Sequence, residues 1–349
     1  MSRKELKYKY IYFNENYGKR WKVDPWEYNA ICLRDVENLK GVHVVQCIPD
    51  FMPQWVRFLF CIHTSKKINK KIRLPFQKLW YPIYFKKKKE TKPYCFVVAR
   101  YDLPIDYLTY LKKKYPDCRL VKIHRDLVKI TYNYEGYSEK NMRNIFDLRM
   151  TYDIGEGKLY GFPTFNEIES KINVPIANEY PLCDVFFAGK AKDRLEKLVK
   201  AYDIFEKAGL KCEFYITNVS LEEQVQRDGI TYSDKYMPYI DMLYKSVNAR
   251  CILDINQEGA VGYTSRIIEA IIYNKKLITD NITVLKSKYY DQHAIQYIKI
   301  IEDIDPQFVN QNCEVNYCYE GDFSPIHLIY QIDRELTKYD AIDFELKYK

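Results

Sequence analysis

The second half of the chain repeats one pattern, in which a short apolar segment is followed by a loop and an amphipathic segment. Residues 183–190 read CDVFFAGK, and residues 191–209 carry apolar side chains at helical spacing before a closing glycine. Further apolar segments occupy 211–218, 250–256 and 275–280. Because strands that alternate with helices form mainly parallel sheets, this pattern predicts an α/β fold.

The first half shows the same alternation less regularly. Apolar segments that predict strands occupy 8–14, 42–49, 94–101 and 118–125, and residues 105–115 predict a helix. Two such α/β halves in 349 residues suit two domains of ordinary size. We therefore expect two Rossmann-like domains that face a cleft, with ligands at the carboxyl ends of the strands.

The boundaries follow from a stretch with little periodicity. Residues 172–183 contain two prolines, and we place the linker there. The prediction is an N-terminal domain over 1–178, a second domain over 183–322 and a C-terminal helical segment over 324–349. Ser324 followed by Pro325 is a typical helix start.

Charge divides the chain into a basic and an acidic part. Residues 1–150 contain 32 Lys and Arg against 15 Asp and Glu, whereas the remainder contains 23 against 32. A basic half attracts an anionic partner. Within Lys66–Lys89, lysines alternate with aromatic residues, which is typical of a segment on an anionic bilayer surface. A solvated loop explains the same segment equally well. Nucleic acid is not expected, because no binding signature accompanies the charge.

The cysteines and the N-terminus indicate the compartment. The ten cysteines stand mostly singly in apolar contexts, without a CxxC pair, so we expect reduced thiols and no zinc site. The chain begins without a secretion signal and has no apolar run long enough to span a bilayer. The expected location is the cytoplasm, with peripheral contact at the inner face of the cell membrane as an option.

A predicted helix near Thr264 carries an unexpected glutamate. At 100° per residue its isoleucines share one face, while Arg266 and Glu269 fall on the opposite side. Taken alone, this arrangement is a surface ion pair that contributes about 0.2–0.5 kcal/mol.

The order of elements around this helix gives it a second interpretation. A strand, a loop with Glu258, Gly259 and Gly262, a helix with Glu269 and a strand ending at Asp280 resemble the C-terminal half of GT-B glycosyltransferases. The resemblance implies that Glu269 accepts hydrogen bonds from the ribose of a nucleoside-diphosphate sugar. The amides of residues 259–264 would suit the diphosphate. The Thr264 hydroxyl and the Arg266 charge would add to this site, and Glu258 would lie near the sugar.

The segment FFAGKAKDRLEKLVKAYDIF is similar to another part of the same family. There Lys190 and Arg194 stand near the positions of two cations that neutralise the leaving diphosphate, and Gly189 is a further expected donor-binding residue. The implied function is transfer of a sugar to a glycan or lipid-linked acceptor, of the kind found in bacterial polysaccharide and lipopolysaccharide biosynthesis. Neither a metal nor another cofactor is expected.

The catalytic group is not fixed by the sequence. Glu15, Asp50, Asp102 and His124 stand at or near predicted strand ends and are candidate bases for an acceptor hydroxyl. A retaining enzyme of this fold needs no such base, so the stereochemistry stays open. Val261 occupies the position where the family usually has its first glutamate. A catalytically inactive binding protein is therefore an alternative, and a basic nucleic-acid-associated protein is another.

Overall fold

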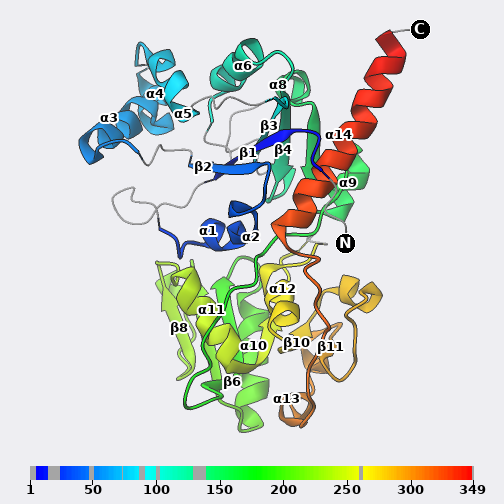
Figure 1. The fold of residues 1–349 in the computed structure, drawn as a ribbon. Helices are drawn as coiled ribbons and strands as arrows, with labels where there is room; N and C mark the ends of the chain where they lie inside the picture. Colours follow the sequence, from blue (N-terminus) through cyan, green and yellow to red (C-terminus); the bar gives the residue numbers. More distant parts are fainter. Residues whose placement is uncertain are drawn as a thin grey trace. The chain divides into compact units, whose positions relative to one another are not determined.

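The computed structural model divides the chain into two units, shown in Figure 1. Unit 1 comprises Met1–Ser170 and Ser324–Lys349, and unit 2 comprises Lys171–Phe323. The structure describes residues 5–14, 24–46, 51–72, 74–85, 91–99, 103–128, 139–258 and 262–347.

Unit 1 contains a five-stranded parallel sheet in the order β2-β1-β3-β4-β5. The strands are β1 Lys9–Asn14, β2 Val42–Gln46, β3 Tyr94–Val98, β4 Arg119–His124 and β5 Leu148–Thr151. The predicted strand segments 8–14, 42–49, 94–101 and 118–125 coincide with β1, β2, β3 and β4. Because β1 and β3 are buried along nearly their whole length, both faces of the sheet must be covered.

Helices cover the two faces of this sheet through separate apolar clusters. Ile11, Phe13 and Phe96 point to one face. Tyr10 and Tyr12 point to the other. This alternation is the period of two expected of a strand. Before residue 171, the described part of the unit contains the helical elements α1 Tyr28–Cys32, α2 Arg34–Glu37, α3 Gln54–Thr64, α4 Lys66–Lys71, η2 Gln77–Trp80, α5 Tyr81–Tyr84, α6 Ile105–Lys114, α8 Glu139–Ile145 and α9 Ile154–Tyr160.

The last helix, α14 (Pro325–Lys347), belongs to unit 1 although it follows unit 2 in sequence. Ile329, Ile332 and Leu336, which recur at helical spacing, are almost fully buried in the cluster on the Tyr10 face. The Ser324 hydroxyl accepts a hydrogen bond from the Ile326 amide at 3.4 Å, as expected of a capping serine. The fold class predicted from sequence therefore includes this helix correctly.

Unit 2 contains a six-stranded parallel sheet in the order β11-β10-β9-β6-β7-β8. The strands are β6 Cys183–Lys190, β7 Cys212–Thr217, β8 Ile230–Ser233, β9 Ala249–Asp254, β10 Lys276–Thr279 and β11 Ile295–Tyr297. The structure confirms the predicted strands at β6, β7, β9 and β10. The strands β8 and β11, which are short and lie at the edges of the sheet, are not predicted from the sequence.

Helix α10 (Leu195–Lys207) packs on one face of this sheet through a cluster that includes Val185 and Phe187. Helices α11 (Tyr239–Asn248) and α12 (Ser265–Ile272) pack on the other face, against residues such as Phe186 and Ile252. The remaining helical turns are η3 Leu221–Glu223, η4 Ile282–Lys286, η5 Ile301–Asp303 and α13 Gln307–Asn310.

The nine cysteines that the structure describes are free, and six of them are buried. Among them, Cys95, Cys212 and Cys251 lie in strands, as their apolar contexts predict. Across the described ranges, we find no helix with both the length and the apolar character needed to cross a bilayer.

Candidate functional site

Unit 2 has a topological switch point between β6 and β9. From β6 the chain runs outward to β7 and β8, then returns to β9 on the other side of β6 and continues outward to β10 and β11. The loops that follow β6 and β9 therefore leave the same edge of the sheet in opposite directions. Ligands of open parallel sheets bind in the crevice that such loops create.

Three contacts hold these two loops together. The Arg194 guanidinium donates to the Ile255 carbonyl, and the Asp193 carboxylate accepts from the Glu258 amide at 2.7 Å. The Lys192 ammonium donates to the Gln257 side chain. Hydrogen bonds therefore link the loops on the two sides of the switch point within unit 2.

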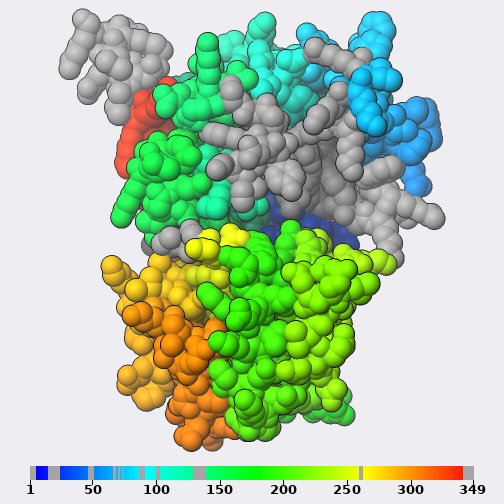
Figure 2. All heavy atoms as spheres, turned by 180° about the vertical axis from the view of Figure 1, so that it is seen from behind, coloured from blue at the N-terminus to red at the C-terminus, as the bar shows by residue number. Residues whose placement is uncertain are grey.

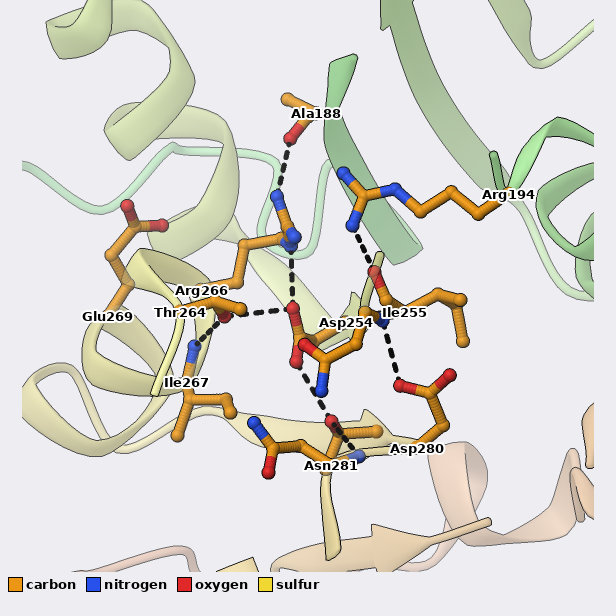
Figure 3. Close-up of polar contacts among 12 residues, drawn as sticks. Ala188, Arg194, Asp254, Ile255, Thr264, Arg266, Ile267, Glu269, Asp280 and Asn281 are labelled. Carbon is orange, nitrogen blue, oxygen red and sulfur yellow. Dashed lines mark hydrogen bonds and ion pairs between the residues drawn. The ribbon is translucent and has the colours of Figure 1, made fainter. Parts of the chain in front are cut away.

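Asp254, the last residue of β9, organises the region beneath the loops. Its fully buried carboxylate accepts hydrogen bonds from the Thr264 hydroxyl at 2.8 Å, Arg266 Nε at 3.0 Å and the Thr279 hydroxyl at 2.9 Å (Figure 3). Thr264 also caps α12 by accepting from the Ile267 amide at 3.3 Å. The predicted helix start at Thr264 is confirmed, and Asp254 ties it to β9 and β10.

Two arginines converge on Gly189, near the end of β6. Arg266 Nη1 donates to the Ala188 carbonyl at 3.2 Å, and Arg194 Nη2 donates to the Lys190 carbonyl at 3.1 Å. A Cβ atom on Gly189 would lie 3.2 Å from Arg266 Nη1 and 3.4 Å from Arg194 Nη2. Both guanidinium groups also stand over the Phe187 ring, at 5.0 and 5.4 Å from its centre. The glycine therefore leaves room for two adjacent cations.

Among the described residues, no ion pair balances the charge of Arg194. Arg266 pairs with Asp254, whereas Arg194 forms no ion pair with the carboxylates that the structure describes. Its Nε atom is buried and has no hydrogen-bond partner within the described residues. Burial, together with the charge of Arg266, lowers the pKa of Arg194 to about 10, so the group stays charged at neutral pH. A buried cation with an unused donor favours an anionic ligand.

The other predicted donor residues lie around the same loops. Lys190 is half-buried, with its ammonium 5.4 Å from the centre of the Tyr236 ring. Glu258 is exposed and is held through its backbone amide. Gly262 is buried, and its carbonyl accepts from Asn281 Nδ2 at 2.9 Å. Gly259 lies outside the described residues.

A pocket of about 490 Å³ opens between these loops. Three carboxylates are among its lining residues: Asp193, Glu258 and Asp280. Burial raises the pKa of Asp280, whose carboxylate accepts from the Asn256 amide at 2.8 Å (Figure 3). Carboxylates accept hydrogen bonds from hydroxyl groups, so this wall is suited to a polyhydroxylated ligand. The full lining is Asp193, Lys197, Asn256, Gln257, Glu258, Asp280, Asn281 and Ile282.

The predicted orientation of Glu269 is wrong. The sequence places it on an outward face with Arg266, but its side chain is fully buried and accepts from the Tyr239 and Ser246 hydroxyls, each at 3.3 Å. Both donors belong to α11, which packs beside α12 and covers the face that the helical wheel left open. Burial raises the pKa of Glu269 to about 7, with Arg266 and the two hydroxyls opposing the rise. Its role at a ribose stays a prediction.

Of the candidate bases in unit 1, the structure describes only His124. Glu15, Asp50 and Asp102 lie outside the described residues. The His124 ring is fully buried and stacks on Phe162, with centres 5.9 Å apart. Burial, reinforced by the charges of Lys122 and Arg149, lowers its pKa to about 3. Such an imidazole is a weak base with no exposed surface, so its environment disfavours the predicted role.

Sequence reasoning missed three residues of the switch-point region. Asp254 lay unmentioned within the segment 250–256, Asp280 was named only as the end of a strand, and Asp193 received no role. Their common signal is a carboxylate at or shortly after the end of a parallel strand, where the carboxyl ends of neighbouring strands meet. A search for acids at these positions would have found all three.

Comparison with known proteins shows a match in fold only. No known family pattern matches the sequence, and no curated protein matches it either. The catalytic domain of starch synthase IV from Arabidopsis thaliana has a TM-score of 0.53 at 8% identity, over 96% of this chain and 99% of that one. The trehalose-6-phosphate synthase OtsA has a TM-score of 0.52 at 8% identity, over 97% and 99%. The chain thus has the fold of these glycosyltransferase structures, the GT-B fold that the sequence predicts.

Proposed function

We propose that this chain transfers a glycosyl group from a nucleoside-diphosphate sugar to a glycan or a lipid-linked saccharide. In this reaction an acceptor hydroxyl bonds to the anomeric carbon, and the bond from that carbon to the diphosphate breaks. The hydroxyl proton passes to a base or to the departing diphosphate. The step leaves a nucleoside diphosphate anion, whose developing charge fixed cations can stabilise.

The observation that carries the proposal is the pair of guanidinium groups against Gly189. Arg194 forms no ion pair there within the described residues, Arg266 is held by Asp254, and Lys190 adds a third, half-buried cation. The diphosphate would bind at these groups. The carboxylate-lined pocket beside them would receive hydroxyl groups of the sugar or the ribose.

The starch synthase structure supports the same assignment. That protein was obtained with ADP and acarbose bound, which are a nucleoside diphosphate and a saccharide. The excess of Lys and Arg in residues 1–150 supports an acceptor with phosphate groups, such as a lipid-pyrophosphate-linked glycan. Polysaccharide or lipopolysaccharide biosynthesis is the process that would use such an acceptor.

A thermal-shift screen tests the donor site. The purified chain is measured with UDP-, GDP-, CMP- and dTDP-sugars, and with the free nucleotides. We expect one nucleotide class to stabilise it, by about 2.7 kcal/mol when the ligand is at 100 times its Kd. Arg194→Gln and Lys190→Gln should each weaken that stabilisation at least about tenfold in apparent Kd, because each removes a charged contact to the diphosphate.

Arg227→Gln is the matched control. Arg227 lies in the same unit but forms an ion pair with Asp203, at 2.8 Å, that is about one-third exposed. Its loss should leave nucleotide binding unchanged. The proposal fails if none of the nucleotides stabilises the chain, or if Arg194→Gln and Lys190→Gln bind the preferred nucleotide as tightly as Arg227→Gln does.

A further inference from the structure

Helix α3 in unit 1 presents an apolar face to solvent. Trp55, Phe58, Leu59 and Ile62 follow the spacing i, i+3, i+4, i+7 and so share one face. Their exposed fractions are 68%, 48%, 50% and 37%. A helix on a protein surface ordinarily turns polar residues outward, so a complete apolar stripe facing solvent indicates a partner.

The opposite face of α3 is anchored in the unit 1 core. Phe60 is buried and packs edge-on against Trp80 and Tyr84, with ring centres 5.3 and 5.1 Å apart. The Trp80 indole donates to His63 Nδ1 at 2.7 Å, which ties the end of α3 to η2. The helix is therefore held in its orientation, and the exposed stripe is a property of the folded unit.

The start of η2 adds two more exposed apolar side chains, one from its N-cap residue and one from within η2. Phe76 and Leu79 are 75% and 73% exposed. Phe76 has a φ of 60°, a left-handed conformation that is unfavourable for an aromatic residue. A strained residue that presents a bare aromatic ring to solvent is more often kept for binding than for stability.

Charge identifies the partner. Residues 51–89 contain 11 Lys and Arg but no Asp or Glu, so the charge of this segment is entirely positive. Lys71 and Lys78, which the structure describes, are both exposed. In the space-filling view the blue atoms of this region lie at the surface of unit 1 (Figure 2). An anionic lipid surface offers both a hydrocarbon boundary and phosphate charge, whereas nucleic acid offers no hydrocarbon for the apolar stripe.

We propose that the surface formed by α3 and η2 docks onto an anionic lipid bilayer. The apolar stripe enters the boundary between headgroups and acyl chains, while the lysines remain at the level of the phosphates. This assignment does not depend on the donor site, because the donor site is built from residues of unit 2 and the docking surface belongs to unit 1.

Co-sedimentation with vesicles tests the proposal. One set contains phosphatidylcholine alone, and the other contains equal amounts of phosphatidylcholine and phosphatidylglycerol. We expect the full chain to bind the anionic vesicles and to dissociate as salt rises. Phe58→Ser combined with Leu59→Ser should lower the partition coefficient at least about tenfold, because two exposed apolar side chains leave the interface. Lys71→Glu combined with Lys78→Glu should lower it by a similar factor.

Matched control variants come from other surfaces. Leu159→Ser with Leu221→Ser replaces two leucines that are 74% and 85% exposed, and Lys158→Glu with Lys207→Glu reverses two exposed lysines. All four proteins are first compared by thermal unfolding. If the α3 variants unfold, the wild-type protein still provides a test, because its tryptophan emission should shift to the blue on anionic vesicles and Trp55→Phe should lose most of that shift.

Three results would overturn the proposal. They are equal binding to neutral and anionic vesicles, unchanged binding by both α3-surface variants, and binding to random oligonucleotides without binding to vesicles. Nucleotide stabilisation of unit 2 is measured separately in the same preparations, so a failure here does not resemble a failure of the donor site.

Discussion

Each of the two parallel sheets places an arginine with a largely buried side chain at its carboxyl edge, but the surroundings of the two charges differ. In unit 1, Arg125 follows β4 and its Nε donates to the Glu167 carboxylate at 2.6 Å. Its other nitrogens donate to Asn29 Oδ1 and the Tyr28 hydroxyl, at 3.2 and 3.0 Å. In unit 2, Arg194 donates to two carbonyl groups and to no carboxylate that the structure describes.

This difference separates a structural arginine from one suited to a ligand. A guanidinium paired with a carboxylate and two further acceptors has little left to offer an anion. One that is bonded only to carbonyls keeps its charge, and Arg194 also keeps an unused Nε donor within the described structure. The comparison therefore favours unit 2 as the unit that binds the diphosphate.

The largest effect on stability is expected at Arg125, the arginine that is paired with a carboxylate. Glu167→Gln leaves the buried Arg125 charge without its carboxylate, which should lower the free energy of unfolding by about 3–5 kcal/mol. The side chains of Arg125 and Glu167 are only 12% and 10% exposed, so solvent cannot compensate. Chemical denaturation measures the loss.

Asp203→Asn serves as the control for that measurement, because it breaks a pair with Arg227 that is about one-third exposed. Its cost should not exceed about 1 kcal/mol. Equal costs for the two variants would show that Arg125 does not depend on Glu167, and the contrast between the two sheets would collapse.

The sequence was sufficient for elements but not for the contacts between them. The apolar run at 183–190 coincides with β6, and the capping residue Thr264 marks the start of α12. Glu269 was misplaced because a helical wheel describes one helix, whereas burial depends on α11 packing against it. Arg125 was overlooked because it ends an apolar strand segment, and its partner Glu167 lies 42 residues away in sequence.

The second prediction concerns Glu269 and pH. Its folded-state pKa of about 7 lies above the ordinary value of 4.5, so between these values the folded state binds a proton that the unfolded state has released. Stability should therefore fall as pH rises from 4.5 through 7, and the penalty should reach about 3 kcal/mol above that range. Glu269→Gln removes this group from the titration.

The difference in unfolding free energy between Glu269→Gln and wild type is the measured quantity. It should grow in favour of the variant from pH 4.5 to pH 7.5 and then level off. A difference that is flat across this range would place the Glu269 carboxylate in contact with solvent or with a compensating cation. If the variant also keeps its nucleotide binding, Glu269 positions α11 against α12 and does not contact a ribose.

The third prediction concerns Gly189, which lies beside Arg194 at the proposed diphosphate site. Gly189→Ala places a Cβ atom 3.2 Å from Arg266 Nη1 and 3.4 Å from Arg194 Nη2, so the Arg266 guanidinium must move by a few tenths of an ångström while that of Arg194 is in van der Waals contact. Because charged contacts to a diphosphate depend on position, we expect the apparent Kd of the preferred nucleotide to rise about tenfold. Isothermal titration calorimetry measures this change.

Thermal unfolding provides the control for Gly189→Ala. The φ of Gly189 is not in the left-handed region, so alanine causes no backbone strain there and the unfolding temperature should change little. Unchanged nucleotide affinity in a stable variant would mean that the diphosphate binds away from the two arginines.

The smallest expected effect is that of a chelator. If Arg194, Arg266 and Lys190 supply the positive charge at the diphosphate, a divalent cation is not needed to stabilise the leaving group. Nucleotide binding and transfer rates should then stay within about twofold when EDTA is added to protein dialysed free of metal. A loss that magnesium or manganese restores would assign the charge stabilisation to a metal. Arg194 would then be a second structural arginine, like Arg125, and the distinction between the two sheet edges would no longer mark the donor site.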